Sequence, residues 1–221
     1  MSIWAIVPVK PLQQSKSRLS GVLSPLQRAG VSRHLLARTL HVLAETPRIA
    51  RVLVISRDPA ALALARRAGA RTLLEEGAPE LNSALTRATT FAQSSRIEGV
   101  LVLPTDLPLL TAADLDALLD FGSMGAAVVI APDRHEQGTN ALFVRPPGII
   151  PYAFGPGSFA EHCRSAEQVC VSLSICRRPG FALDLDLPEV LQLAEAANHG
   201  NWTLSPPVSI VPSSSPLEER K

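Results

Sequence analysis

The chain of 221 residues has few cysteines, few lysines and no long hydrophobic segment. Its three cysteines, Cys163, Cys170 and Cys176, lack the short spacing of a structural zinc site. An odd number of cysteines, and a first basic residue that follows the first apolar stretch, predict a cytoplasmic, reduced protein without a secretory signal. No apolar run approaches the roughly 20 residues of a membrane helix, so we expect no membrane partner.

An excess of one charge is also missing, because 21 Lys and Arg residues face 20 Asp and Glu residues, a net charge of +1. A near-neutral protein lacks the basic field on which nucleic-acid binding depends, so we expect no nucleic-acid partner. The length predicts one large domain, over residues 1–202. The remaining segment, Thr203–Lys221, is rich in Ser and Pro and is interpreted as a disordered tail.

The scarce lysines are placed unevenly, since the chain has only Lys10, Lys16 and Lys221. The first two follow the first predicted strand, in a segment that also contains Ser15, Ser17 and Arg18. Ammonium and guanidinium groups with backbone amides at a strand-to-helix turn can bind a triphosphate. A Walker A motif is absent, and a solvated basic loop is the alternative interpretation.

Apolar runs and helix-capping residues predict alternating strands and helices. Strands are expected at 3–9, 51–56, 70–74, 99–103, 126–131, 140–145 and 169–175, and helices at 25–45, 59–68, 81–92, 112–121, 158–165 and 188–198. This order predicts an α/β fold, a three-layer αβα sandwich with a mostly parallel, Rossmann-like sheet. Ligands of such folds bind at the carboxyl ends of the strands, so the loops after Val9, after Leu103 and near Asp184 should converge.

Carboxylates follow two of the buried segments. Asp106 lies between two prolines just after a predicted strand, and Asp184 and Asp186 share one face if their segment is extended. Carboxylates at this edge of a sheet are natural Mg²⁺ ligands, so we expect one or both of the latter pair to bind metal together with Asp106. The alternative is a turn or helix cap; Asp186 would then cap a helix that starts near Pro188.

The remaining candidate binding groups are two glycine-rich turns, at 137–142 and 154–159, and one amide side chain. Glycines let backbone amides approach an anion, and Ser158 opens a helix whose N-terminus attracts negative charge. The amide of Asn82 can read a nucleobase edge, with a helix cap as the alternative. Each turn also fits ordinary turn chemistry.

Taken together, the motifs resemble those of GT-A-type nucleotidyltransferases, and more narrowly the 2-phospho-L-lactate/phosphoenolpyruvate guanylyltransferase family (CofC/FbiD) of coenzyme F-420 biosynthesis. The motifs, in chain order, are VPVKPLQQSKSRLSGVLS, ELNSAL, LPTDLPLL, GTNALFVRPP, FGPGSFAEH and LDLDLPEVL. The resemblance runs from about Ile3 to Asn198. One departure is Glu80, at a position where the family motif has glycine before its Leu-Asn pair.

The resemblance implies an enzyme that moves GMP from GTP to a small phosphorylated carboxylic acid and releases pyrophosphate. It implies three acceptor acids, phosphoenolpyruvate first, then 2-phospho-L-lactate or 3-phospho-D-glycerate, and it allows a homodimer. The implied roles are catalysis by Lys10, Lys16, Arg18 and Asp106; nucleotide binding by Pro8, Lys10, Lys16, Ser17, Arg18, Asn82 and Thr105; acceptor binding by Thr139, Gly155 and Ser158; and Mg²⁺ binding by Asp106, Asp184 and Asp186.

Two other functions compete with this one. The first is a nucleotidyltransferase with a molybdopterin-type acceptor, against which the small FGPGS turn argues. The second is a catalytically silent nucleotide-binding module, for which three acids beside a triphosphate would have little use.

Overall fold

The computed structural model describes residues 2–77 and 79–185, whose strands form a single sheet. The strand order is β3-β2-β1-β4-β6-β5-β7, and within the described residues β6 alone runs antiparallel to its neighbours. The strands are β1 (Ile3–Pro8), β2 (Ile49–Ser56), β3 (Arg71–Leu74), β4 (Gly99–Val102), β5 (Ala127–Pro132), β6 (Thr139–Arg145) and β7 (Ser172–Ile175). The predicted mostly parallel α/β sheet is therefore confirmed.

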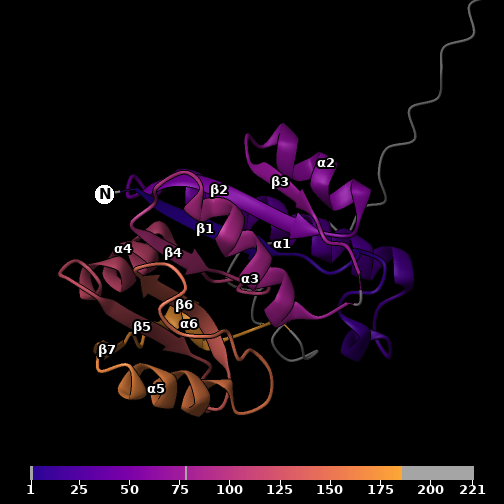
Figure 1. The fold of residues 1–221 in the computed structure, drawn as a ribbon. Coiled ribbons are helices and arrows are strands. Elements are labelled where there is room, and N and C mark those ends of the chain that lie inside the picture. Colours follow the sequence, from indigo (N-terminus) through magenta and orange to yellow (C-terminus); the bar gives the residue numbers. More distant parts are fainter. Residues whose placement is uncertain (1, 78, 186–221) are drawn as a thin grey trace, which may run out of the picture.

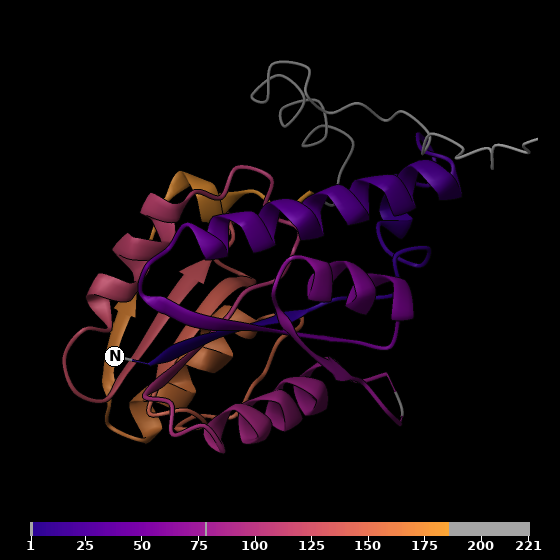
Figure 2. The same cartoon turned by 90° about the horizontal axis from the view of Figure 1, so that it is seen from above.

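Helices cover both faces of this sheet (Figures 1 and 2). The helices are α1 (Pro25–Ala44), α2 (Pro59–Arg67), α3 (Leu81–Gln93), α4 (Ala112–Phe121), α5 (Ser158–Gln168) and α6 (Pro179–Ala182), with a 3-10 turn, η1, at Ser17–Leu19. Alternate residues of β1 point to opposite faces, so Ala5 and Val7 pack under α1, α2, α4 and α6, whereas Trp4 and Ile6 pack under α3 and α5. These two cores make the three layers of the sandwich.

The helix starts follow the capping residues of the sequence. Ser24 and Gln27 form a capping box at α1, with Pro25 in its first turn. The Asp58 carboxylate accepts the Ala60 N–H at α2, and Thr111 and Asp114 form a second capping box at α4. These helices therefore begin at the residues that the sequence predicted.

One strand and one helix boundary were wrong. Helix α5 continues to Gln168, and β7 begins only at Ser172 instead of Val169. Val169 and Val171 give the apolar alternation that is typical of a strand. In the structure, however, Val169 is the C-cap of α5, and Cys170 has a left-handed backbone with φ of 54°. The turn η1 and the short α6 were not predicted. The predicted helix 188–198 and the boundary between the domain (1–202) and the tail (203–221) lie outside the described residues.

The chain order reverses beside β1, and this reversal locates a crevice. From β1 the sheet extends to β2 and β3 on one side and to β4 on the other, all four strands parallel. The connections after β1 and β4 therefore leave the same edge of the sheet in opposite directions. In α/β folds ligands bind at this point, outside the carboxyl ends of the strands.

A close backbone contact fixes α6 against α4. The Asp114 side chain is 6% exposed and accepts hydrogen bonds from Thr111 N, Thr111 Oγ1 and Arg178 Nε. A Cβ atom on Gly180 would lie 2.1 Å from Asp114 Oδ2 and 3.2 Å from the Leu109 carbonyl oxygen. Only glycine fits between these groups.

We therefore expect Gly180→Ala to lower the free energy of unfolding by about 1–3 kcal/mol, because the buried carboxylate would have to move out of its hydrogen bonds. Urea unfolding followed by circular dichroism measures this change. Gly21→Ala is the matched control, since a Cβ there meets no atom within 4 Å. Equal stability of the two variants would contradict the packing argument.

Candidate active site

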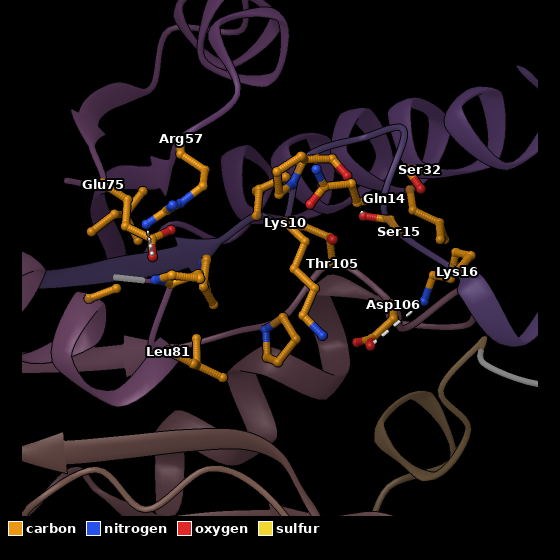
Figure 3. Close-up of a pocket in the computed structure, with 18 of the residues that line it drawn as sticks. Lys10, Gln14, Ser15, Lys16, Ser32, Arg57, Glu75, Leu81, Thr105 and Asp106 are labelled. Carbon is orange, nitrogen blue, oxygen red and sulfur yellow. Dashed lines mark hydrogen bonds and ion pairs between the residues drawn. The ribbon is translucent and has the colours of Figure 1, made fainter. Parts of the chain in front are cut away.

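A cavity of about 540 Å³ opens at the crevice beside β1 (Figure 3). The loops that follow β1, β2, β3 and β4 and the first turn of α3 surround it. The polar or charged lining residues are Lys10, Gln14, Ser15, Lys16, Ser32, Arg57, Glu75, Glu80, Thr105 and Asp106. The expected convergence of the loops after β1 and β4 is thus present in the structure.

An ion pair joins these two loops at one end of the cavity. Lys16 Nζ lies 3.7 Å from Asp106 Oδ2, and the side chains are 8% and 31% exposed. Lys16 itself has a left-handed backbone, with φ of 58°, which is uncommon for a residue with a side chain. Lys10 also lines the cavity, so two ammonium groups and one carboxylate face the same space.

Side chains from neighbouring elements hold both loops in place. The Asp58 carboxylate, which caps α2, also accepts the Leu12 N–H at 2.8 Å. Arg38 of α1 donates from Nε to the Pro108 carbonyl at 2.8 Å and from Nη2 to the Leu110 carbonyl at 2.9 Å. The loops that carry Lys16 and Asp106 are therefore fixed by α1 and α2.

The opposite end of the cavity carries charged residues that sequence reasoning missed. Arg57 Nη2 lies 3.3 Å from Glu75 Oε1 and donates to the Gly77 carbonyl at 2.9 Å. Glu80 is the N-cap of α3, and its hydrogen bonds to Ser83 and Asn82 lower the pKa of the carboxyl group. Arg57 and Glu75 directly follow β2 and β3, so a parallel sheet could have predicted their place at this edge.

The predicted nucleotide-binding and metal-binding residues divide into three groups. Pro8, Lys10, Lys16, Thr105 and Asp106 line the cavity. Ser17, Arg18 and Asp184 are not among its lining residues. Ser17 and Arg18 belong to η1, and the Leu185 N–H, one residue after Asp184, donates to the Asp106 carbonyl at 2.8 Å. The backbone of Asp184 therefore approaches the Asp106 loop, whereas Asp186 lies outside the described residues.

The predicted acceptor-binding residues lie around the start of α5. Gly155 and Gly157 have positive φ, and Ser158 begins the helix with 2% exposure. The Thr139 hydroxyl lies 3.0 Å from His162 Nδ1, and the Ala153 N–H donates to His162 Nε2 at 3.0 Å. Because Nε2 accepts, the proton of the neutral ring belongs on Nδ1, which then donates to Thr139.

Asn82 does not line the cavity, although its helix does. Its Oδ1 accepts the Phe154 N–H at 2.8 Å, and its Nδ2 donates to the Phe154 carbonyl at 3.1 Å. Glu80, and not Asn82, caps the helix. The helix-cap alternative for Asn82 is therefore wrong, and its amide side chain contacts the Phe154 backbone instead.

Comparison with known proteins fits this geometry. Residues 3–206 match the family model described as guanylyl transferase CofC like. The chain belongs to this family. A phosphoenolpyruvate guanylyltransferase of Rubrobacter xylanophilus is 46% identical over 197 residues, which cover 89% of this chain and 95% of that protein. A 2-phospho-L-lactate guanylyltransferase of Methanothermobacter thermautotrophicus is 38% identical over 203 residues, 92% and 87% of the two chains.

Solved structures agree with the CofC-like assignment at the level of the fold. A nucleotidyl transferase from Methanothermobacter superposes with a TM-score of 0.66 at 14% identity, covering 90% of this chain and 98% of that one. The expectation of a GT-A-like nucleotidyltransferase is confirmed. Within the described residues, no helix is long and apolar enough to cross a bilayer.

His162 gives the CofC-like domain a specific pH dependence. Burial lowers the pKa of His162 from 6.5 to about 4, against a smaller opposing effect of Glu161. The unfolded chain therefore takes up a proton near pH 6.5, whereas the folded chain does not until about pH 4. Stability is full above pH 6.5 and is lost as the pH falls through this window, by about 2 kcal/mol at pH 5.

We expect urea unfolding at pH 7.5 and pH 5.0 to show this loss in the wild type and in the surface control His135→Gln, but not in His162→Gln. NMR titration of the His162 ring in the wild type provides a second readout that needs no variant. A titration midpoint near 6.5 would contradict the burial argument.

Proposed function

We propose that this protein transfers the guanylyl group of GTP to the phosphate of phosphoenolpyruvate and releases pyrophosphate. The observation that carries the proposal is the convergence of Lys10, Lys16 and Asp106 in a 540 Å³ cavity at the strand-order reversal. The family match and the names of the relatives support guanylyl transfer. The 46% identity to a phosphoenolpyruvate enzyme favours that acceptor over 2-phospho-L-lactate.

The two ends of the cavity suit the two ends of a nucleotide. The ammonium groups of Lys10 and Lys16 would neutralise the triphosphate, with Ser17 and Arg18 nearby in η1. The base would then extend toward Arg57, Glu75 and the first turn of α3. The acceptor would bind at Thr139, Gly155 and Ser158, around the N-terminus of α5.

Residues that suit a magnesium ion are present. Asp106 offers a partly exposed carboxylate, and the backbone of Asp184 runs beside its loop. No cluster of three or more His, Cys, Asp or Glu ligands occurs in the part of the chain that the structure describes. Proteins usually bind Mg²⁺ through one or two carboxylates, and substrate phosphates complete the coordination. Asp106 with Asp184 or Asp186 would therefore hold the ion. When bound, the ion supplies charge neutralisation at the phosphates.

The reaction needs no protein nucleophile or base. An oxygen of the acceptor phosphate bonds to the α-phosphorus of GTP, the bond from that phosphorus to the bridging oxygen breaks, and pyrophosphate leaves with the electron pair. The acceptor phosphate is already ionised at neutral pH. This chain's contribution to catalysis is then the positioning of two anions and the neutralisation of their charge by Lys10 and Lys16.

The first measurement is pyrophosphate release from GTP and Mg²⁺ with each acid in turn, phosphoenolpyruvate, 2-phospho-L-lactate and 3-phospho-D-glycerate, with the product identified by mass. We expect phosphoenolpyruvate to give the highest kcat/KM. A higher value for another acid would contradict the proposed acceptor but not guanylyl transfer. If GTP binds but no pyrophosphate is released with any of the three acids, a molybdopterin-type acceptor or a catalytically silent module would be favoured. The other nucleoside triphosphates would then be tested.

Replacing the proposed metal ligand gives a sharper test. We expect Asp106→Asn to lower kcat by about 100-fold or more, because the neutral amide cannot share the metal with the phosphates. Asp116→Asn, in α4 and outside the cavity lining, should keep wild-type rates. An Asp106→Asn variant that retains Mg²⁺-dependent turnover within about tenfold would contradict the assignment.

A further inference from the structure

The two hydrogen bonds of Asn82 are unusual because both go to the backbone of a single residue, Phe154, which is 72 positions away in the sequence. Oδ1 accepts the Phe154 N–H, and Nδ2 donates to the carbonyl of the same residue. The peptide groups on both sides of Phe154 thus fix which end of the amide is oxygen and which is nitrogen. Phe154 therefore occupies the edge at which the Asn82 amide presents one N–H donor and its oxygen side by side.

The residues next to Asn82 in the sequence face the cavity, which the Asn82 side chain does not. Glu80, Leu81 and Ala84 line the nucleotide cavity, whereas Asn82 is not among the lining residues. The first turn of α3 therefore has the cavity on one side and residue Phe154 on the other. A base in the cavity would meet Glu80 and Leu81 before the Asn82 amide.

The segment that Asn82 holds leads directly into the proposed acceptor site. Phe154 precedes Gly155, and its neighbour Ala153 donates its N–H to the buried His162. The Tyr152 hydroxyl lies 2.6 Å from Thr89 Oγ1, about two turns after Asn82 along α3. Residues 152–154 are therefore tied to α3 and α5 immediately before the two glycines with positive φ, Gly155 and Gly157.

We propose that Asn82 is a positioning residue for the acceptor acid and not a reader of the nucleobase. From the rim of the nucleotide cavity it holds the backbone at Phe154, and so fixes the 155–158 turn relative to the nucleotide. This inference rests on the proposed function, because it takes the turn as the acceptor site. In this proposal, the Asn82 side chain of the ELNSAL segment connects the nucleotide site to the acceptor site.

The test is the kinetics of Asn82→Ala with the acceptor and GTP varied in turn. Losing both hydrogen bonds should raise the acceptor KM about tenfold. The GTP KM should stay within about twofold, and the preference for GTP over ATP should not change. Asn82→Asp keeps an acceptor for the Phe154 N–H, so its acceptor KM should lie between those of the wild type and Asn82→Ala.

Thr86→Ala is the matched control. Its hydroxyl donates to the Asn82 carbonyl on the exposed side of the same helix, so its loss alters α3 without touching Phe154. We expect both KM values to stay at wild-type levels. Circular dichroism compares the fold of every variant, and Asn82→Asp replaces Asn82→Ala if the alanine variant does not fold.

Two results would overturn the proposal about Asn82. A raised GTP KM, or an altered base preference, with an unchanged acceptor KM would make Asn82 a base-reading residue. Unchanged values of both KM in Asn82→Ala would remove any positioning role. Absence of turnover in the wild type with every acid would instead refute the proposed function, and this result is distinct because no variant is involved.

Discussion

The reversal of strand order beside β1 is the constraint on which the rest of the molecule depends. Strand β1 is hydrogen-bonded to β2 on one side and β4 on the other, and its residues are buried on both faces. The chain that leaves its carboxyl end has to enter solvent and turn away from the chain that leaves β4. The crevice between the two connections is therefore a consequence of the topology, and the loops on its walls are free to carry polar groups.

Charge then determines how these loops are held. The Lys16 side chain is nearly buried, and removing its charge from water would cost free energy if no opposite charge lay nearby. Asp106 supplies that opposite charge from the other wall of the crevice. Asp58 and Arg38 use backbone N–H and carbonyl groups of the two loops, so they fix loop shape as well as loop position. The result is a preorganised site, in which the groups that would neutralise phosphates are placed before a substrate arrives.

The proposed acceptor site is held in place by different interactions. Around residues 152–158 the structure contains no ion pair comparable to that of Lys16, within the residues it describes, and the backbone is held by neutral side chains. His162 is fully buried and has a lowered pKa, so it can serve as a neutral donor to Thr139 while it accepts from Ala153. Asn82 holds Phe154 from α3, so this helix lies between the cavity and the 152–158 segment.

The sequence by itself determined the layers of the fold, the starts of α1, α2 and α4, and the edge at which Lys10, Lys16 and Asp106 meet. Local signals suffice for these features, because capping residues and apolar periodicity act within a few residues, and parallel strands put their carboxyl ends at one edge. The sequence did not determine the contacts of Asn82, Arg57 or His162. Their partners are 72, 18 and 23 residues away, and only the tertiary structure brings them together. An amide beside a cavity is compatible with base reading until the folded chain places a peptide group within its reach.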